Sequence, residues 1–202
     1  MLRKISNLLI TNHKKKNLIL GRNIEEIKDK ELIQLNCNDL IQPLIGLGGL
    51  SFSRKISEFS GNLISFENDK IHSQFNVILN DVYFYLSLIS KDGSTKITFD
   101  IFTGRIIGFE CFVGYTGKTI EGIGIGMSIK LALSIDSSLG FDLDYDVFCR
   151  SPFDGLLIYP PNNLRDECIN AACSNGEYPD FNIDSILILE KEYYKKHLEH
   201  LS

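Results

Sequence analysis

The sequence predicts an α+β fold, in which a twisted antiparallel sheet carries helices packed on one face. Two observations lead to this prediction. Residues 62–112 are rich in β-branched and aromatic side chains and contain short glycine turns, which is typical of an antiparallel meander. Short helical patterns lie outside that stretch, and their apolar faces have to pack against a sheet.

The bulk composition is that of a folded globular chain. With 202 residues, of which 44% are hydrophobic and 23% charged, it excludes a disordered, collagen-like or coiled-coil protein. There is no run of 18 apolar residues, and the apolar run at 8–10 is too short for the core of a signal peptide. We therefore expect a cytoplasmic protein with no membrane partner. The odd number of cysteines, five, indicates free thiols in a reducing compartment.

Residues 1–42 are predicted to form a basic N-terminal arm and a first helix. Residues 1–22 hold six lysines or arginines and no acid. Asn23 is followed by Glu26 in a capping pattern, which predicts a helix from Asn23 to about Leu35. Residues 43–202 are predicted to form the antiparallel α+β domain.

Three strands are predicted early in this domain. Val82–Ser90 and Thr95–Phe102 flank an Asp-Gly pair, and Thr95–Phe102 and Arg105–Phe112 flank a Thr-Gly pair. Glycine accepts the positive φ that tight turns require, so both junctions are predicted to be hairpin turns.

Residues 141–148 alternate between apolar and acidic side chains, which predicts one half-buried strand. Asp142, Asp144 and Asp146 would share the exposed face of that strand.

The remaining predicted elements lie toward the C-terminus. A helix is predicted after Asn163, whose side chain is placed to cap it, and the sequence Ser-Asn-Gly at 174–176 ends it. Strands are predicted at Gly155–Tyr159 and Ile183–Glu190, followed by a C-terminal helix at Tyr193–Leu201.

One internal similarity bears on the architecture. Residues 50–56, LSFSRKI, match residues 123–129, IGIGMSI, at an offset of 73, and each segment follows glycines. Unless the match is chance, one helix-plus-sheet unit is duplicated as repeats 43–118 and 119–190. Residues 127–135 fit a short helix but also alternate like a strand, and the sequence leaves both interpretations open.

Acidic residues are concentrated in the second half of the domain. Residues 131–190 hold eleven acids against two arginines, a net charge of −9. The simpler interpretation is a solvated, self-repelling surface; the functional one is a face for a basic protein partner, with no nucleic acid bound. The residues expected to bind this partner are Asp142, Asp144, Asp146, Asp154, Glu177, Tyr178 and Asp180.

No catalytic or cofactor pattern is present in the sequence. Gly117-Lys118-Thr119 lacks the earlier glycine and the following helix of a phosphate-binding loop. Alternate carboxylates on a strand lie about 7 Å apart, too far to converge on one metal ion. Cys168 and Cys173 have no second ligand pair for zinc, and no histidine neighbours a candidate nucleophile. We therefore expect no enzymatic activity, no metal and no cofactor.

Two segments carry a family resemblance. PLIGLGGL at 43–50 and TIEGIGIGMS at 119–128 resemble small bacterial proteins in which such a segment leads into a helix on an antiparallel sheet. The duplicated arrangement is similar to the tandem-repeat plan of the β-lactamase inhibitory proteins. Small acidic proteins of this type resemble the immunity proteins of bacterial polymorphic and contact-dependent toxin systems.

The resemblance covers about residues 43–190. It implies a cytoplasmic immunity protein, active in bacterial competition, that binds a cognate basic toxin and neutralises it by occlusion. The alternative is a small-ligand-binding α+β domain without catalytic activity. The sequence leaves the oligomeric state open.

Overall fold

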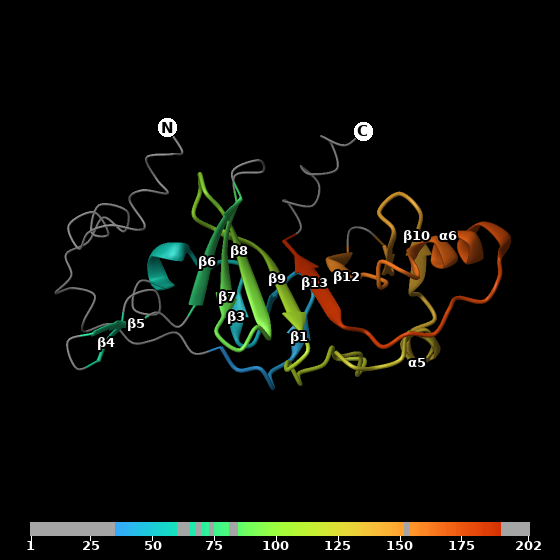
Figure 1. Cartoon of the computed structure of the whole chain (residues 1–202), viewed down its shortest axis with the longest axis horizontal. Coiled ribbons are helices and arrows are strands. Elements are labelled where there is room, and N and C mark those ends of the chain that lie inside the picture. Colours follow the sequence, from blue (N-terminus) through green and yellow to red (C-terminus); the bar gives the residue numbers. More distant parts are fainter. Residues whose placement is uncertain are drawn as a thin grey trace.

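A computed structural model describes most of the chain from residue 35 to residue 190. The described ranges are 35–59, 65–67, 70–72, 75–80, 85–151 and 154–190. Their centre is an eight-stranded sheet in the order β10-β11-β12-β13-β9-β8-β7-β6, with every neighbouring pair antiparallel (Figure 1). Its strands are β6 (Phe75–Asn80), β7 (Tyr85–Ser90), β8 (Thr95–Asp100), β9 (Ile106–Phe112), β10 (Gly140–Asp142), β11 (Val147–Cys149), β12 (Leu156–Ile158) and β13 (Ser185–Leu189).

Smaller elements accompany this sheet, and two helices are found within the described ranges. The elements are β1 (Ile41–Gln42), β2 (Gly46–Leu47) and β3 (Leu50–Ser51) of a three-stranded sheet, the hairpin β4 (Ser65–Glu67) and β5 (Lys70–His72), the 3-10 helix η1 (Ile56–Phe59), and the helices α5 (Ile129–Ile135) and α6 (Arg165–Ser174). Neither α5 nor α6 is long and apolar enough to cross a membrane.

The large sheet consists of two four-stranded meanders. Strands β6 to β9 pair in chain order, and strands β10 to β13 do the same. The final strands of the two meanders, β9 and β13, pair with each other along their length, with Phe112 opposite Ser185 and Gly108 opposite Leu189. The last described strand therefore lies in the middle of the sheet, beside a strand far away in sequence (Figure 1).

The predicted early meander is confirmed by β7, β8 and β9. Gly93 and Gly104 turn the chain with φ values of 73° and 67°, which residues with a side chain rarely adopt. Asp92 stabilises the first turn, because its Oδ1 accepts hydrogen bonds from the Ser94 amide at 3.0 Å and the Ser90 hydroxyl at 2.6 Å. The turn is therefore determined by local side-chain chemistry that the sequence displays.

One face of the large sheet, called the core face below, is covered by the other elements. Phe99, Phe109 and Phe148 point from three different strands into one apolar cluster and are fully buried. The two helices bury Ile129 and Cys168 in the same cluster, and the three-stranded sheet and η1 also contribute to it. The predicted antiparallel α+β architecture is confirmed.

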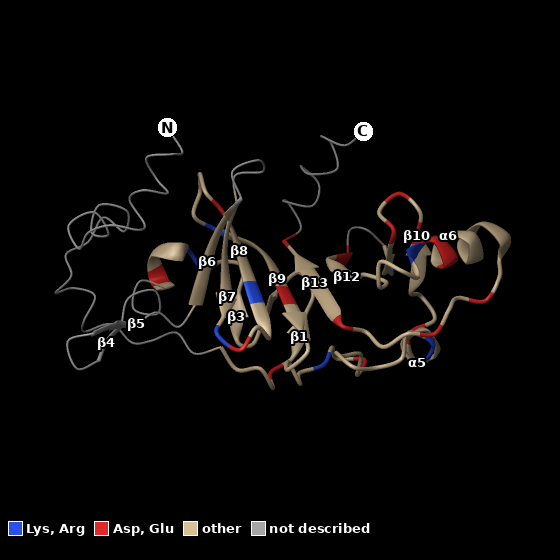
Figure 2. Ribbon diagram, in the orientation of Figure 1, with Lys and Arg blue, Asp and Glu red and all other residues tan. Residues whose placement is uncertain are grey.

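The opposite side of the sheet, called the outer face below, has a different character. Lys96 and Glu110 form an ion pair of 2.9 Å across β8 and β9, and Figure 2 shows basic and acidic segments side by side there. Toward β11 and β12 the outer face carries a second, smaller cluster of Val147, Cys149 and Leu157.

The segment before η1 is held by two backbone hydrogen bonds. The Ile56 amide donates to the Gly104 carbonyl oxygen at 2.8 Å, and the Ile106 amide donates to the Arg54 carbonyl oxygen at 3.3 Å. These bonds attach the start of η1 to the start of β9.

The segment before α5 is held in the same way. The Ile129 amide donates to the Phe181 carbonyl oxygen at 2.8 Å, and the Ile183 amide donates to the Met127 carbonyl oxygen at 2.8 Å. These bonds attach the start of α5 to the approach of β13. The residues that enter η1 and α5 are those that the 73-residue sequence match equates.

Residues 129–135 form a helix, so the strand interpretation of this stretch is wrong. The Ser128 hydroxyl caps the helix by accepting a hydrogen bond from the Leu131 amide at 3.4 Å. Ile129 and Ala132 are buried, three positions apart on one helix face, whereas the residues between them are exposed.

The helix predicted after Asn163 is confirmed as α6, but Asn163 does not cap it. The N-cap is Leu164 and has no side-chain cap hydrogen bond. The Leu164 amide donates to the Pro161 carbonyl oxygen at 2.9 Å, so Asn163 lies inside a turn that precedes the helix. The predicted end is confirmed, since Asn175 follows the helix in the left-handed conformation with a φ of 52°.

The strands predicted at 155–159 and 183–190 are confirmed as β12 and β13. The helix predicted at 193–201 lies outside the described residues, and so does the helix predicted at 23–35 apart from residue 35. The last residues of the predicted arm pair with a later segment, because the Ile41 amide donates to the Lys118 carbonyl oxygen at 2.9 Å. At residue 117 a Cβ would lie 1.9 Å from the Asp39 carbonyl oxygen, so this contact requires Gly117.

Candidate functional site

The acidic stretch at 141–148 is a hairpin rather than the single strand predicted. It folds back between β10 and β11, with residues 143–146 as the turn. Asp142 Oδ1 accepts hydrogen bonds from the amides of Asp144 at 2.9 Å and Tyr145 at 3.1 Å. Side-chain bonds of this kind stabilise a turn in competition with an extended strand. The strand prediction is therefore wrong, because it treated Asp142 only as a surface charge.

Asp146 completes this turn. It has a φ of 55°, which aspartate tolerates better than most residues, and its carboxylate pairs with the guanidinium of Arg165 in the first turn of α6. Asp144 is exposed at the tip. Residues 142–146 are called the acidic turn below.

Asp154 and Asp142 of the acidic turn both lie close enough to Cys149 to affect its thiol. Burial, and after it the carboxylates of Asp142 and Asp154, raise the pKa of the Cys149 thiol to about 11. Cys149 belongs to the small cluster on the outer face, so both aspartates lie at the β11–β12 end of that face.

The remaining predicted acids surround the start of α5. Asp180 Oδ1 accepts hydrogen bonds from the Ser128 hydroxyl at 2.5 Å and the Lys130 amide at 3.4 Å. The bond from Ser128 is the main reason why the pKa of Asp180 is lowered. Glu177 pairs loosely with Lys130 at 3.4 Å, and its side chain is 93% exposed.

The side chain of Tyr178 packs against the core instead of projecting from the surface. Its ring packs edge-on against Phe148 with centroids 5.1 Å apart, and it also contacts Phe141 at 6.3 Å. The ring is half-buried at the border of the main core. The predicted binding residues therefore separate into the acidic turn with Asp154, the group around α5, and this core aromatic.

Both arginines of the acidic half are already paired. Arg165 pairs with the acidic turn, and Arg150 lies between the carboxylates of Glu121 and Asp136, each at 2.5 Å. A hydrogen bond from the Ser138 hydroxyl, followed by those from Arg150, lowers the pKa of Asp136. These bonds keep Asp136 ionised while neutralising the arginine.

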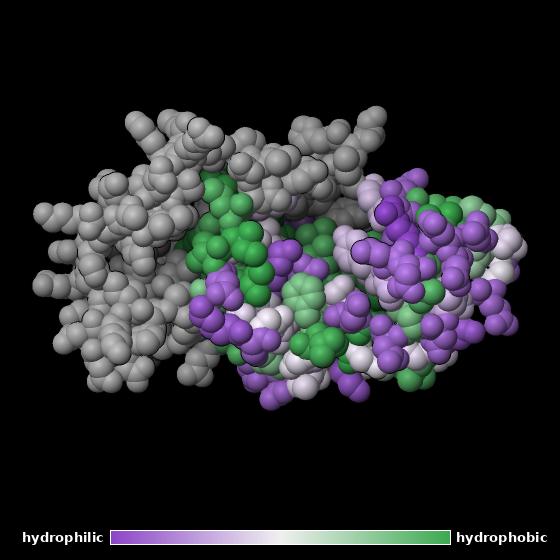
Figure 3. All heavy atoms as spheres, viewed as in Figure 1, coloured by the Kyte–Doolittle hydropathy of each residue, from purple (hydrophilic) through white to green (hydrophobic). Residues whose placement is uncertain are grey.

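Acidic side chains outnumber basic ones on the exposed surface of this half. In Figure 2 they mark the turn above β10, the start of α6 and the chain that leads to β13, and Figure 3 shows hydrophilic residues gathered at this end. The exposed acids among them are Asp144, Asp166, Glu167, Glu177, Asp180 and Asp184.

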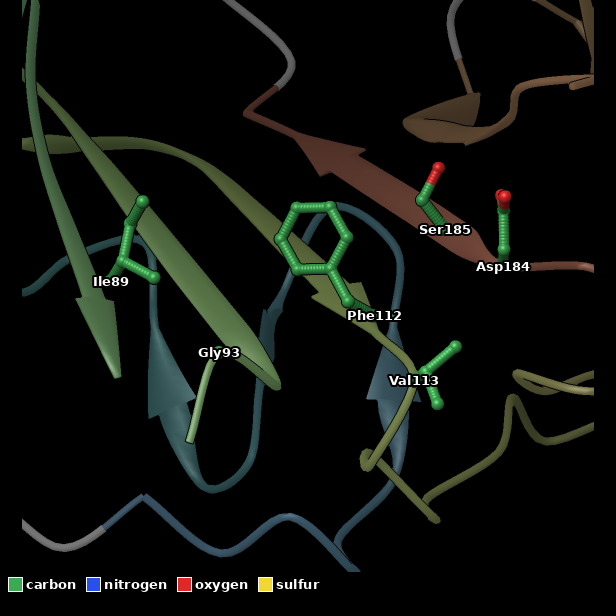
Figure 4. Close-up of a pocket in the computed structure, with 6 residues that line it drawn as sticks. All are labelled: Ile89, Gly93, Phe112, Val113, Asp184 and Ser185. Carbon is green, nitrogen blue, oxygen red and sulfur yellow. The ribbon is translucent and has the colours of Figure 1, made fainter. Parts of the chain in front are cut away.

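A hollow of about 570 Å³ opens on the outer face where β9 ends and β13 begins. Ile89, Phe112 and Val113 form its apolar part (Figure 4). Asp184 and Ser185 line the opposite side of the hollow, and Gly93 of the β7–β8 turn lines the remaining side. The hollow is called the outer hollow below.

Sequence reasoning missed the outer hollow. Phe112 and Ser185 are direct cross-strand neighbours in the sheet, but they are 73 positions apart in the chain. No local pattern announces the pairing of β9 with β13. The sequence itself shows only that an apolar residue, Val113, directly follows a predicted strand; its exposure of 72% becomes visible only in the structure.

Within the described ranges, no group of three or more His, Cys, Asp or Glu side chains is arranged to hold a metal ion. Comparison with known protein families, curated proteins and solved structures finds no match to this chain.

Proposed function

We propose that this chain is an inhibitor of the immunity-protein type, which binds a basic protein toxin and neutralises it by occlusion. The observation that carries the proposal is the charge of residues 131–190, a net −9, on a half of the molecule whose two arginines are already paired with acids. The remaining carboxylates act outward on solvent and on any partner.

The charge distribution sets the expected mechanism. Acidic side chains on one half attract a cationic partner during diffusion and orient it before contact, which raises the association rate at low salt. At physiological ionic strength the attraction extends about 8 Å. Exposed acids such as Asp144 and Glu177 therefore act mainly on association, whereas affinity comes from apolar side chains buried on contact.

A duplicated architecture belongs to this proposal. The matching hydrogen bonds at the starts of η1 and α5, and the two meanders joined at β9 and β13, support two tandem repeats. Joined in this way, the repeats share one eight-stranded sheet, whose outer face is available to a protein partner. A cytoplasmic location also belongs to the proposal, and five free thiols support it.

The alternative, a small-ligand-binding domain, is less well supported. Ligand pockets bury most of the ligand and have a few convergent polar groups. The outer hollow is instead open to solvent, with Asp184 and Ser185 on one side only (Figure 4). Such a shape fits a protruding side chain of a protein better than an enclosed small molecule.

The experiment is affinity capture by the tagged full chain from a lysate of its source, with identification of the retained protein by mass spectrometry. The double variant Asp144→Asn, Glu177→Gln removes two exposed acids. The control Leu40→Lys, Gln42→Lys makes the same change of net charge at two exposed sites, one just before β1 and one in it.

We expect a basic protein that is retained by the wild type and the control, and retained less by the double variant. Capture of no protein, or of an acidic protein indifferent to the double variant, would overturn the proposal.

A further inference from the structure

The outer hollow brings together apolar side chains that the other described elements leave partly exposed. Val113 is 72% exposed, and Ile89 and Phe112 are half-buried. Elsewhere the outer face carries the Lys96–Glu110 ion pair, the cluster at β11 and β12, and Ile78 of β6, which is exposed on its own. An apolar floor with a polar rim has the arrangement of a pocket that takes one buried side chain of a protein partner.

The rim of the outer hollow is acidic. Asp184 lines it at the approach to β13, and its carboxylate takes part in no hydrogen bond or ion pair with another described residue. Asp92 precedes Gly93 on the opposite side, where the Ser90 and Ser94 hydrogen bonds lower its pKa and keep it ionised.

Two lysines lie on either side of the β7–β8 turn, and each contacts another side chain. Lys91 Nζ donates to Asn76 Oδ1 on β6 at 2.9 Å, and Lys96 is paired with Glu110 at 2.9 Å. The apolar floor therefore lies between two carboxylates. Lys91, bound to a neutral amide, keeps its charge beside Asp92, whereas the charge of Lys96 is balanced by Glu110.

We propose that the outer hollow receives a large apolar side chain from an extended basic segment of the partner, with flanking cations placed on Asp92 and Asp184. In an extended segment, residues two apart point the same way and lie about 7 Å apart, so the matching pattern is cation-x-apolar-x-cation. The inference rests on the proposed function, because it names where and how the basic partner is held.

The test uses the ¹⁵N-labelled full chain and a synthetic blocked pentapeptide, Lys-Ser-Phe-Ser-Lys. We expect saturable shifts of the amide signals of Gly93, Val113 and Ser185 at millimolar peptide. The peptides Glu-Ser-Phe-Ser-Glu and Lys-Ser-Ala-Ser-Lys should each bind about tenfold more weakly, because each lacks one of the two complementary features.

Two variants distinguish peptide binding in the outer hollow from unspecific attraction of the peptide to the acidic chain. Val113→Lys places a charge on the floor, and its control Ile120→Lys changes a residue that is 86% exposed in a different loop. Asp184→Asn removes a rim charge, and its control Asp144→Asn removes one from the acidic turn. We expect each hollow variant, and neither control, to weaken peptide binding about tenfold.

Equal binding of the three peptides, or shifts confined to the acidic turn, would overturn the inference. A cellular partner that binds Val113→Lys as tightly as the wild type would also overturn it while leaving the proposed function intact. Failure to capture any partner, together with selective binding of Lys-Ser-Phe-Ser-Lys in the hollow, would overturn the proposed function alone.

Discussion

The guanidinium of Arg150 donates a hydrogen bond from Nε to the Asp136 carboxylate at 2.5 Å, which joins the end of β11 to the C-terminus of α5. The same arginine reaches Glu121 at 2.5 Å in the loop before α5. One side chain thus connects three segments of the acidic half and removes its own positive charge from the surface.

Removal of this arginine should destabilise the fold. Arg150→Met leaves two carboxylates, partly buried, without their cation, and we expect a loss of about 1–3 kcal/mol in the free energy of unfolding. Arg150→Lys should lose less, because the charge remains while the fork of donors is lost. Urea denaturation measures both, and equal stability of Arg150→Met and the wild type would contradict the assigned role.

The ion pair between Arg150 and Asp136 also predicts how the free energy of unfolding depends on pH. The pKa of Asp136 is lowered from 3.8 by the Ser138 hydroxyl and then by Arg150, so its carboxylate stabilises the fold above pH 3.8. That contribution is lost as the pH falls through the lower folded value. We expect the free energy of unfolding to fall below about pH 4 in the wild type and to fall less in Arg150→Met, as measured by urea denaturation across pH. Parallel profiles would contradict this linkage.

The acidic turn depends on one of its three aspartates for its local structure. Asp142→Ala removes the acceptor of two amide hydrogen bonds and should cost about 1 kcal/mol, whereas Asp144→Ala at the exposed tip should cost close to nothing. Asp142→Asn keeps an acceptor oxygen and should retain most of the stability. A thermal denaturation series compares them, and equal effects of Asp142→Ala and Asp144→Ala would show that the turn does not need this side chain.

The thiols should differ sharply in reactivity. Burial raises the pKa of Cys111 to about 12 and that of Cys149 to about 11, whereas Cys173 is exposed on α6. Because the thiolate is the reactive species, Ellman's reagent at pH 8 should modify Cys173 long before Cys111 and Cys149. Cys173→Ser should remove a fast phase of one equivalent, and its persistence would place a second reactive thiol at the surface.

The fold could be predicted from sequence where local chemistry determines it. The turns at Gly93 and Gly104, and the end of α6 at Asn175, follow from residues that tolerate positive φ. The acidic turn was mistaken for a strand because alternation in a short window does not record the hydrogen bonds of Asp142. An aspartate often accepts hydrogen bonds from the amides that follow it, so a turn at Asp142 is predictable from the residue type alone.

The candidate site could not be predicted in the same way. The outer hollow arises where β9 pairs with β13, and pairing between distant strands leaves no periodic trace in either segment. Tyr178 illustrates the converse, since its position between acidic neighbours suggested exposure while its ring packs against Phe148. Both depend on long-range packing, which only the folded chain determines.

The most direct test of the central claim is the rate at which this chain associates with its captured partner as salt is raised. The account predicts that the wild-type rate falls by about tenfold or more between about 20 and 300 mM salt, and that the double variant Asp144→Asn, Glu177→Gln is slower at low salt and less sensitive to salt. The control Leu40→Lys, Gln42→Lys should follow the wild type. A rate that does not depend on salt, or a control that slows as much as the double variant, would contradict steering by the acidic half.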